Sequence, residues 1–278
     1  MNKIFKKTLV LCIIVLLTAT NSLTSLAQSR IQPDVYSPEF PNAYIETGNI
    51  MTRADGDTTV TATVYVKEVY QEIDGKQICI DSTLLSKSEV QNIGKENFKN
   101  AQITRSSIYP GTSEVKEQLT LRLTIPSQAS QNERDLRIYA SWNGGSGKYG
   151  PAPGDDFVGF IWGGEFDYYA ESISGLNATK NPMIFYKADH EPNAGMVWGF
   201  KEAAPFMDYL NAFITLKKNK LTGGGNTTSI SAKYIHTYQS FAGTISINLS
   251  QEGFGIGFAL SDCPQQWSLV ASLSGIKY

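Results

Sequence analysis

The sequence predicts a mainly β protein: an antiparallel β-sandwich with a C-terminal meander and at most one or two short helices. Apolar and polar residues alternate along most of residues 58–278, which is the pattern of strands with one buried face. The pair Asp74-Gly75 has the composition of a tight hairpin turn between two such strands. Helical spacing is scarce by comparison.

Residues 1–27 have the organisation of a secretory signal peptide. Three lysines precede an apolar run from Leu9 to Leu17, and small residues end at Ala27. The run is too short to anchor the chain across a bilayer. We therefore expect cleavage after Ala27 and a secreted mature protein, and the short, lysine-led signal is of a bacterial type.

The mature chain divides into two parts. Residues 28–57 contain three prolines and no clear period, so we expect an extended N-terminal arm along the surface. Residues 58–278 contain no internal repeat and no obvious long linker. They are therefore predicted to form a single β-rich domain.

The strand pattern can be followed in order through this domain. Alternation is clear in residues 58–66, 119–125 and 136–142. Near the C-terminus it recurs in four successive segments, which predict the meander: residues 230–238, 245–249, 254–260 and 267–273.

Two segments have helical features. Residues 89–99 would form a helix capped by Ser88, with Gln91 completing a capping box. Residues 203–216 fit either a helix or a short turn that enters a strand at Ala212. We favour the strand because residues 213–217 alternate.

The Asp74-Gly75 hairpin fixes the expected position of one of two mature cysteines. It pairs Tyr70 with Cys79 and places both on the face of Val64, unless a bulge near Lys67–Glu68 reverses the faces. In an oxidising compartment Cys79 and Cys263 are candidates for one disulfide. Two buried thiols are the alternative.

The charge of the mature chain excludes some partners. The signal carries three of the 24 Lys and Arg and none of the 26 acids, which leaves a net charge of −5. A mildly acidic chain without a basic run argues against nucleic acid as a partner and against binding to anionic membrane surfaces.

Residues 141–170 are the segment most suited to recognition. They contain eight of the 24 glycines, together with aromatic rings that can stack on a ligand and carboxylates that can accept hydrogen bonds. We expect the 143–156 loop to lie at one rim of the sandwich. The alternative is that residues 157–162 form a buried strand. The candidate ligand-binding residues are Trp142, Tyr149, Asp155, Asp156, Trp162, Glu165, Asp167 and Tyr169.

Catalytic and metal motifs are incomplete. Residues 144–148 resemble a phosphate loop but lack its spacing and its Ser or Thr. With His190 and His236 as the only histidines, a His-rich zinc site cannot form, and we expect no metal and no cofactor. His236 lies in strand register, which predicts a packed or hydrogen-bonded residue. Enzymatic activity therefore stays undecided, with Glu165, Asp167 and Glu171 as the carboxylates that a glycoside hydrolase would need.

These observations favour a secreted, noncatalytic binding protein that recognises a surface glycan or a surface protein. A secreted carbohydrate-active hydrolase is the first alternative. A membrane-acting β-hairpin toxin is the second, because residues 244–250 and 253–261 each have a Ser/Thr/Gly-rich face and an apolar face. Ordinary sandwich strands show the same alternation.

Overall fold

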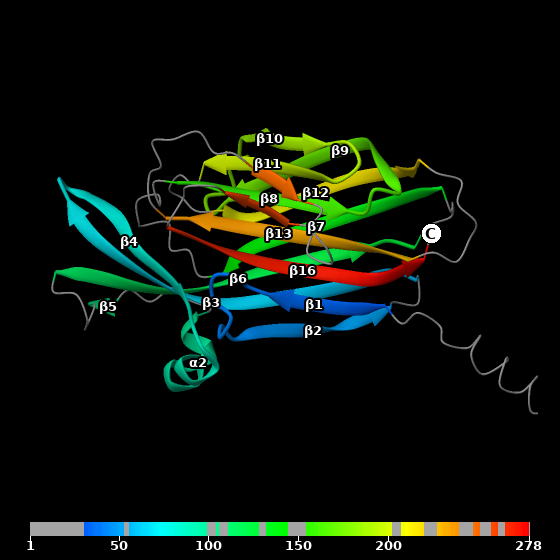
Figure 1. Cartoon of the computed structure of the whole chain (residues 1–278). Coiled ribbons are helices and arrows are strands. Elements are labelled where there is room, and N and C mark those ends of the chain that lie inside the picture. Colours follow the sequence, from blue (N-terminus) through cyan, green and yellow to red (C-terminus); the bar gives the residue numbers. More distant parts are fainter. Residues whose placement is uncertain are drawn as a thin grey trace, which may run out of the picture.

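Two antiparallel sheets pack face to face, which confirms the predicted antiparallel β-sandwich (Figure 1). The predicted signal peptide lies outside the part of the chain that this computed structural model describes, so its cleavage stays a prediction. The described residues are 31–52, 56–98, 104–105, 111–127, 132–143, 154–201, 207–219, 227–238, 247–250, 257–260 and 265–277.

The first sheet has six strands. Their order across the sheet is β1 (Gln32–Tyr36), β16 (Gln266–Lys277), β13 (Thr227–Thr237), β8 (Asp155–Trp162), β11 (Gly195–Lys201) and β10 (Phe185–Glu191).

The second sheet has eight strands. Six follow one another in the order β2 (Ile45–Thr52), β3 (Thr58–Ile73), β6 (Thr112–Ile125), β7 (Glu133–Asn143), β12 (Met207–Lys218) and β9 (Phe166–Asn177). The other two are β4 (Lys76–Leu84), which pairs with β3, and β5 (Thr104–Arg105), which pairs with β6.

The core lies between the sheets because the alternating apolar residues of both sheets face inward. On β3 and β6, which pair without interruption from Thr58↔Ile125 to Gln71↔Thr112, alternate residues are buried. The β-branched and aromatic side chains of these rows fit the pleated, half-buried surface. Large fully buried side chains from both sheets fill the space between them: Trp162, Trp267, Tyr234, Phe160, Phe166, Phe200 and Leu119.

The β3–β4 hairpin confirms the predicted turn. Asp74 and Gly75 have φ values of 51° and 72°, as a two-residue turn of this composition requires, and Tyr70 pairs with Cys79. The bulge lies on β4, between the partners of Val69 and Tyr70, and not near Lys67–Glu68. The hairpin extends beyond the body of the sandwich (Figure 1).

The helix begins earlier than predicted. α2 spans Lys87–Ile93 and is followed by the short 3₁₀ helix η1, Lys95–Phe98. Ser86, not Ser88, is the N-cap: its backbone N and its Oγ both donate to Glu89 Oε2, at 2.8 and 2.6 Å. A carboxylate is a stronger acceptor than the amide of Gln91, and it also favours the helix N-terminus.

The predicted C-terminal meander is wrong in the order in which its strands pair. β13 pairs directly with β16, with Thr237 opposite Gln266, and its other edge pairs with β8. Because both edges of β13 are occupied, the intervening strands β14 (Ile247–Ser250) and β15 (Gly257–Leu260) pair with each other in a separate two-stranded sheet. Neighbours in sequence are therefore not neighbours in this sheet.

Two further segments resolve as strands. The region predicted as an arm contributes an edge strand to each sheet, because β1 pairs with β16 and β2 with β3. Pro33 is tolerated in β1 because an edge strand leaves one side without ladder bonds. Residues 207–218 form β12, as the strand interpretation of residues 203–216 expects, although the strand begins before Ala212.

The first prediction concerns the core. Leu121 is fully buried, so we expect Leu121→Ala to lower the free energy of unfolding by roughly 2–5 kcal/mol. The exposed Ser172 on β9 is the control, and Ser172→Ala should change it by less than about 0.5 kcal/mol. Urea denaturation of both variants measures the difference. Equal destabilisation would contradict this arrangement of the core.

Candidate functional site

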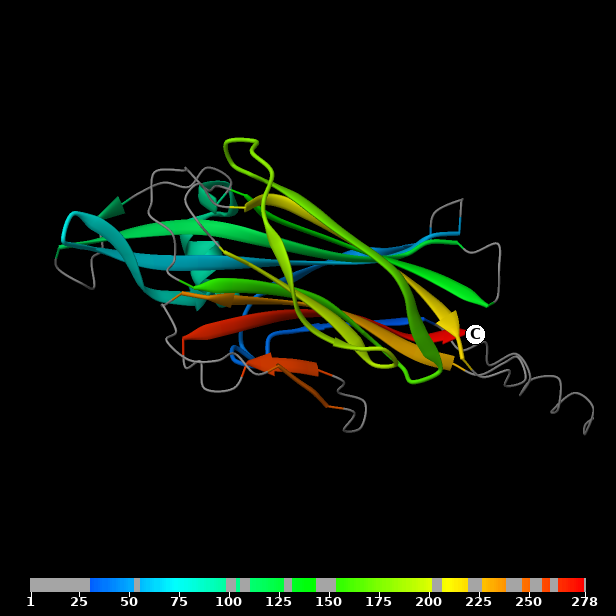
Figure 2. The ribbon, with the colours of Figure 1, turned by 90° about the horizontal axis from the view of Figure 1, so that it is seen from above.

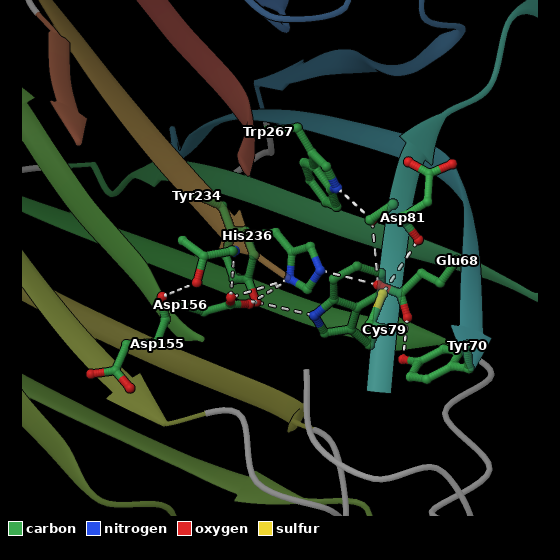
Figure 3. Close-up of polar contacts among 12 residues, drawn as sticks. Glu68, Tyr70, Cys79, Asp81, Asp155, Asp156, Tyr234, His236 and Trp267 are labelled. Atoms are coloured by element: carbon green, nitrogen blue, oxygen red, sulfur yellow. Dashed lines mark hydrogen bonds and ion pairs between the residues drawn. The ribbon is translucent and has the colours of Figure 1, made fainter. Parts of the chain in front are cut away.

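On each of four strands, the inward-facing row of side chains carries a buried polar residue. Figure 3 shows Glu68, Asp156 and His236 among them. Each polar residue keeps the register of the apolar residues beside it on its strand. Glu68 continues the row of Val66 on β3, and Glu117 precedes Leu119 on β6. Asp156 precedes the apolar run of β8, and His236 follows Tyr234 on β13. We call Glu68, Glu117, Asp156 and His236 the buried polar cluster.

His236 joins the two sheets. Its Nδ1 lies 3.1 Å from both carboxylate oxygens of Asp156, within the six-stranded sheet. Its Nε2 lies 3.0 Å from Glu68 Oε1, on the eight-stranded sheet. All three side chains are at most 2% exposed. Two carboxylates facing the two ring nitrogens fit an imidazolium, in which both nitrogens carry a proton.

Further donors satisfy both carboxylates. Asp156 Oδ1 accepts from the backbone N of Thr237 at 3.0 Å, and Asp156 Oδ2 accepts from Tyr234 Oη. Glu68 Oε2 accepts from Tyr70 Oη at 2.5 Å. Buried charges are tolerated when they are paired and hydrogen-bonded in this way.

Indole rings enclose the imidazole. The ring centroids of Trp142 and Trp267 lie 5.4 and 5.1 Å from that of His236. Both indoles also make hydrogen bonds, because Trp142 Nε1 donates to Tyr234 Oη at 3.0 Å and Trp267 Nε1 donates to Ser82 Oγ at 2.8 Å. Polar and aromatic groups thus form one continuous network between the sheets.

Glu117 differs from the other acids of the cluster. Burial raises the pKa of Glu117 well above its usual value, the nearby charge of Glu68 raises it further, and His236 opposes the shift. Glu117 Oε1 is buried without a hydrogen-bond partner among the described residues. Burial therefore favours the protonated form of Glu117 in the folded protein over a wider pH range than in the unfolded chain.

The buried polar cluster connects the two sheets. Its side chains are buried too deeply for a ligand to contact them in this structure. Among the described residues, no group of three His, Cys, Asp or Glu side chains could hold a metal ion. Within the same part of the chain, no helix is both long and apolar enough to cross a membrane.

Three of the sequence-predicted ligand-binding residues lie in the interior. Trp142 and Asp156 belong to the network around His236, and Trp162 is fully buried, with Nε1 donating to Phe166 O at 3.0 Å. Asp156 was expected in a rim loop, but β8 already begins at Asp155 and turns Asp156 inward. Tyr149 lies outside the described residues.

The other four predicted residues have polar or ring partners nearer the surface. Asp155 accepts from Tyr186 Oη at 2.6 Å, and Glu165 accepts from Thr228 Oγ1 at 3.3 Å. Asp167 accepts from Asn219 Nδ2 at 2.9 Å. Tyr169 is 59% exposed, and Lys217 Nζ lies 3.3 Å from its ring centroid. The structure does not bring all of these residues together, and ligand binding by them stays a prediction.

Cys79 is buried in the hairpin, where its Sγ donates to Asp81 O at 3.3 Å. Cys263 lies outside the described residues, so the disulfide stays a prediction.

The outer side of the eight-stranded sheet carries a set of residues that the sequence analysis did not select. Two rows of register partners cross the sheet from β3 to β9 on this side. We call these rows the open face: Thr61, Arg122, Tyr139, Asn211 and Ser174 in one row, and Thr59, Thr124, Arg137, Phe213 and Ser172 in the other.

Cations and rings interleave on the open face. Arg122 Cζ lies 5.2 Å from the ring centroid of Tyr139, and Arg137 Cζ lies 5.4 Å from that of Phe213. Tyr139 also stacks on Tyr209 at 6.2 Å. The sequence did hold a signal for this surface, because Phe213 is an aromatic residue in register with the polar Thr215 and Lys217.

A cavity of about 360 Å³ is lined by residues of β10 and β11 in the six-stranded sheet, by residues of β9 and β12 in the eight-stranded sheet, and by the segment between β9 and β10. Ile184, at its edge, is 88% exposed. The lining residues are Asn177, Pro182, Met183, Ile184, Tyr186, Lys201 and Met207.

No known protein family and no curated protein matches the chain. Among solved structures, the chain is similar to the T6 backbone pilin of serotype M6 Streptococcus pyogenes (10% identity, 74% of this chain and 60% of the pilin covered, TM-score 0.29). It is also similar to the collagen-binding domain of a Staphylococcus aureus adhesin (7%, 48% and 85%, TM-score 0.27). A third is the major pilin SpaD of Corynebacterium diphtheriae (11%, 89% and 82%, TM-score 0.28). TM-scores this low carry no functional argument.

The second prediction compares two neighbouring acids. Asp156→Ala removes the carboxylate that faces His236 Nδ1 and the acceptor of the Thr237 backbone N–H, both in the interior, so we expect it to lower the free energy of unfolding by roughly 3–5 kcal/mol. Asp155→Ala removes one exposed hydrogen bond and should cost less than about 1 kcal/mol. Chemical denaturation at neutral pH compares them. A similar small cost for both variants would show that Asp156 does not carry the bridge.

The third prediction follows from the raised pKa of Glu117. The unfolded chain releases this proton near pH 4.5, whereas the folded chain retains it to higher pH. Between the two pKa values the unfolded state binds fewer protons, so this residue makes the free energy of unfolding fall as pH rises. Glu117→Gln mimics the protonated form and removes the fall.

The measurement is urea denaturation of both proteins from acidic to neutral pH. We expect Glu117→Gln to be more stable than the wild type at neutral pH, with a difference that vanishes below about pH 4.5. A variant that is less stable than the wild type at neutral pH would refute the raised pKa of Glu117.

Proposed function

We propose that the mature chain is a secreted, noncatalytic binding protein that recognises a glycan at a cell surface through the open face. The observation that carries the proposal is the pair of rows in which Arg122, Tyr139, Arg137 and Phe213 alternate cations with rings beside hydroxyl and amide side chains. Secretion rests on the predicted signal peptide in residues 1–27.

The chemistry of this face suits a glycan. Aromatic rings stack on the apolar faces of sugar rings, while hydroxyl and amide groups bond to sugar hydroxyls. The guanidinium groups of Arg122 and Arg137 add donors for carboxylates, with two parallel hydrogen bonds available to each. A sugar that carries carboxylates is therefore the glycan type that we propose. Neighbouring strands lie about 4.8 Å apart, so a row of five residues spans roughly 19 Å.

The local partners of three carboxylates support a noncatalytic function. A glycoside hydrolase needs two of them facing the substrate. Glu165 and Asp167 bond to Thr228 and Asn219, and Glu171 Oε1 lies 2.6 Å from Lys187 Nζ. These local partners support structural roles for all three acids.

The fourth prediction locates the binding surface. On an array of acidic and neutral glycans, the wild type should bind a carboxylate-bearing glycan. Phe213→Ala should weaken this binding about tenfold, a loss of roughly 1–2 kcal/mol of ring stacking and burial. The matched control is Tyr186→Ala on β10, because Tyr186 is 42% exposed and Phe213 is 40% exposed.

The result that would contradict this proposal is loss of binding in Tyr186→Ala with full binding in Phe213→Ala, since it would move the site to the cavity. An empty glycan array, together with binding to cells from which glycans have been removed, would identify a protein ligand instead.

A further inference from the structure

We infer that the cavity lined by β9, β10, β11 and β12 binds a small aromatic carboxylate, an activity that is separate from the glycan binding proposed above. The cavity has a volume of about 360 Å³. Sites for small molecules in proteins span about 300–1,000 Å³ and combine an apolar lining with a few polar groups that orient the ligand. The cavity therefore has the size for a ligand of one or two rings.

The apolar part of the cavity is continuous with the core of the sandwich. Met207 is 2% exposed and belongs to the core, and Met183 packs against the same core. Ile184, which also lines the cavity, is largely exposed. The cavity thus connects solvent with apolar side chains of the interior. Methionine side chains are flexible and polarisable, and their sulfur atoms make favourable contacts with aromatic rings.

The ring of Tyr186 forms a wall of the cavity, and two contacts hold it in place. Tyr186 is the register partner of Gly199, and a Cβ added at Gly199 would lie 2.4 Å from Tyr186 Cζ. The ring therefore lies directly against the backbone of β11. Its Oη donates to Asp155 Oδ2 at 2.6 Å. A ring that is already fixed loses little conformational freedom when a second ring stacks on it.

The turn between β9 and β10, which forms another wall, is also held in place. Asn177 Oδ1 accepts from the backbone N of Thr179 at 3.1 Å and from that of Asn181 at 2.9 Å. Lys180 forms an ion pair with Asp208, which ties the turn to β12. Figure 2 shows this turn, in yellow-green, beside the start of the yellow β12. These contacts form the walls of the cavity before any ligand binds.

Lys201 supplies the charge that selects an anionic ligand. It lines the cavity, and it forms no ion pair within the described residues. Its register partner is Asp155, but the carboxylate of Asp155 accepts from Tyr186. A cation beside an apolar cavity complements a ligand with an apolar body and one negative charge. A single lysine balances a carboxylate, whereas a phosphate monoester carries a charge near −2 at neutral pH.

Calorimetric titration of the mature chain with 2-naphthoate tests the proposal. The wild type should show saturable binding at one site per chain. Tyr186→Ala should weaken this binding about tenfold, because it removes the stacking surface. Tyr186→Phe keeps the ring and should bind within about threefold of the wild type. Circular dichroism melts check that both variants fold.

Gly199→Ala tests the position of the ring and leaves every side chain that lines the cavity unchanged. The added methyl group would occupy the space of Tyr186 Cζ, so the ring must move. We expect 2-naphthoate to bind this variant about fivefold more weakly than the wild type, since a displaced ring stacks less well. Binding of 2-naphthoate with the affinity of the wild type would contradict the role of a fixed ring.

A neutral ligand of the same shape, 2-naphthalenemethanol, tests the role of charge. Lys201→Met keeps an apolar side chain and removes the ammonium group. It should weaken 2-naphthoate about threefold, the small effect of an ion pair exposed to solvent, and leave the affinity for 2-naphthalenemethanol unchanged. The matched control is Lys217→Met near the other end of β12, which should change the affinity for neither ligand.

Three results would overturn the proposal. They are no saturable binding of 2-naphthoate by the wild type, equal binding by Tyr186→Ala and the wild type, and an equal loss of both ligands in Lys201→Met. The two proposed sites can be tested independently, because none of these variants alters the open face. Phe213→Ala should bind 2-naphthoate as the wild type does, and Tyr186→Ala should retain glycan binding.

Discussion

The imidazole of His236 lies between the carboxylates of Glu68 and Asp156 in the interior, and the relation of the two sheets depends on this contact. Glu68 belongs to the eight-stranded sheet and the other two residues belong to the six-stranded sheet. A charge removed from water is costly unless its partners stay in place, so the three strands must keep their relative positions at this end of the sandwich. Elsewhere, nondirectional apolar packing holds the sheets together.

This contact lies at the C-terminal end of β13. Thr237 follows His236 directly, and its backbone N donates to Asp156. The buried polar cluster thus lies at the C-terminal end of β13. The open face is separate from the buried polar cluster. Side chains alternate along each strand, so the residues of the open face lie on the outer side of the eight-stranded sheet.

Much of the fold could be predicted from the sequence because alternation and turn chemistry are local. The rows of β3 and β6 and the Asp74-Gly75 turn needed no knowledge of distant residues. The order of strands was not accessible in this way, since β8 occupies an edge of β13 that a meander would have left open. The candidate site was hard to predict for the same reason, because it depends on where strands begin and which strands are neighbours. Asp155 and Asp156 look alike in sequence, and only the start of β8 turns one outward and the other inward. Glu68 could have been identified from the sequence, because it is a carboxylate in register with Val64 and Val66 and is therefore expected on the buried face of the strand.

The Asp156 carboxylate connects β13 to β8 and, through His236, to β3. Amide hydrogen exchange at Thr237 tests it most directly, because this N–H has its acceptor on Asp156 at the very end of β13. In the wild type we expect exchange at Thr237 as slow as that of the central β13 amides at Ala232 and Tyr234, and in Asp156→Ala we expect fast exchange. Exchange at Thr237 in the wild type as fast as in that variant would contradict it.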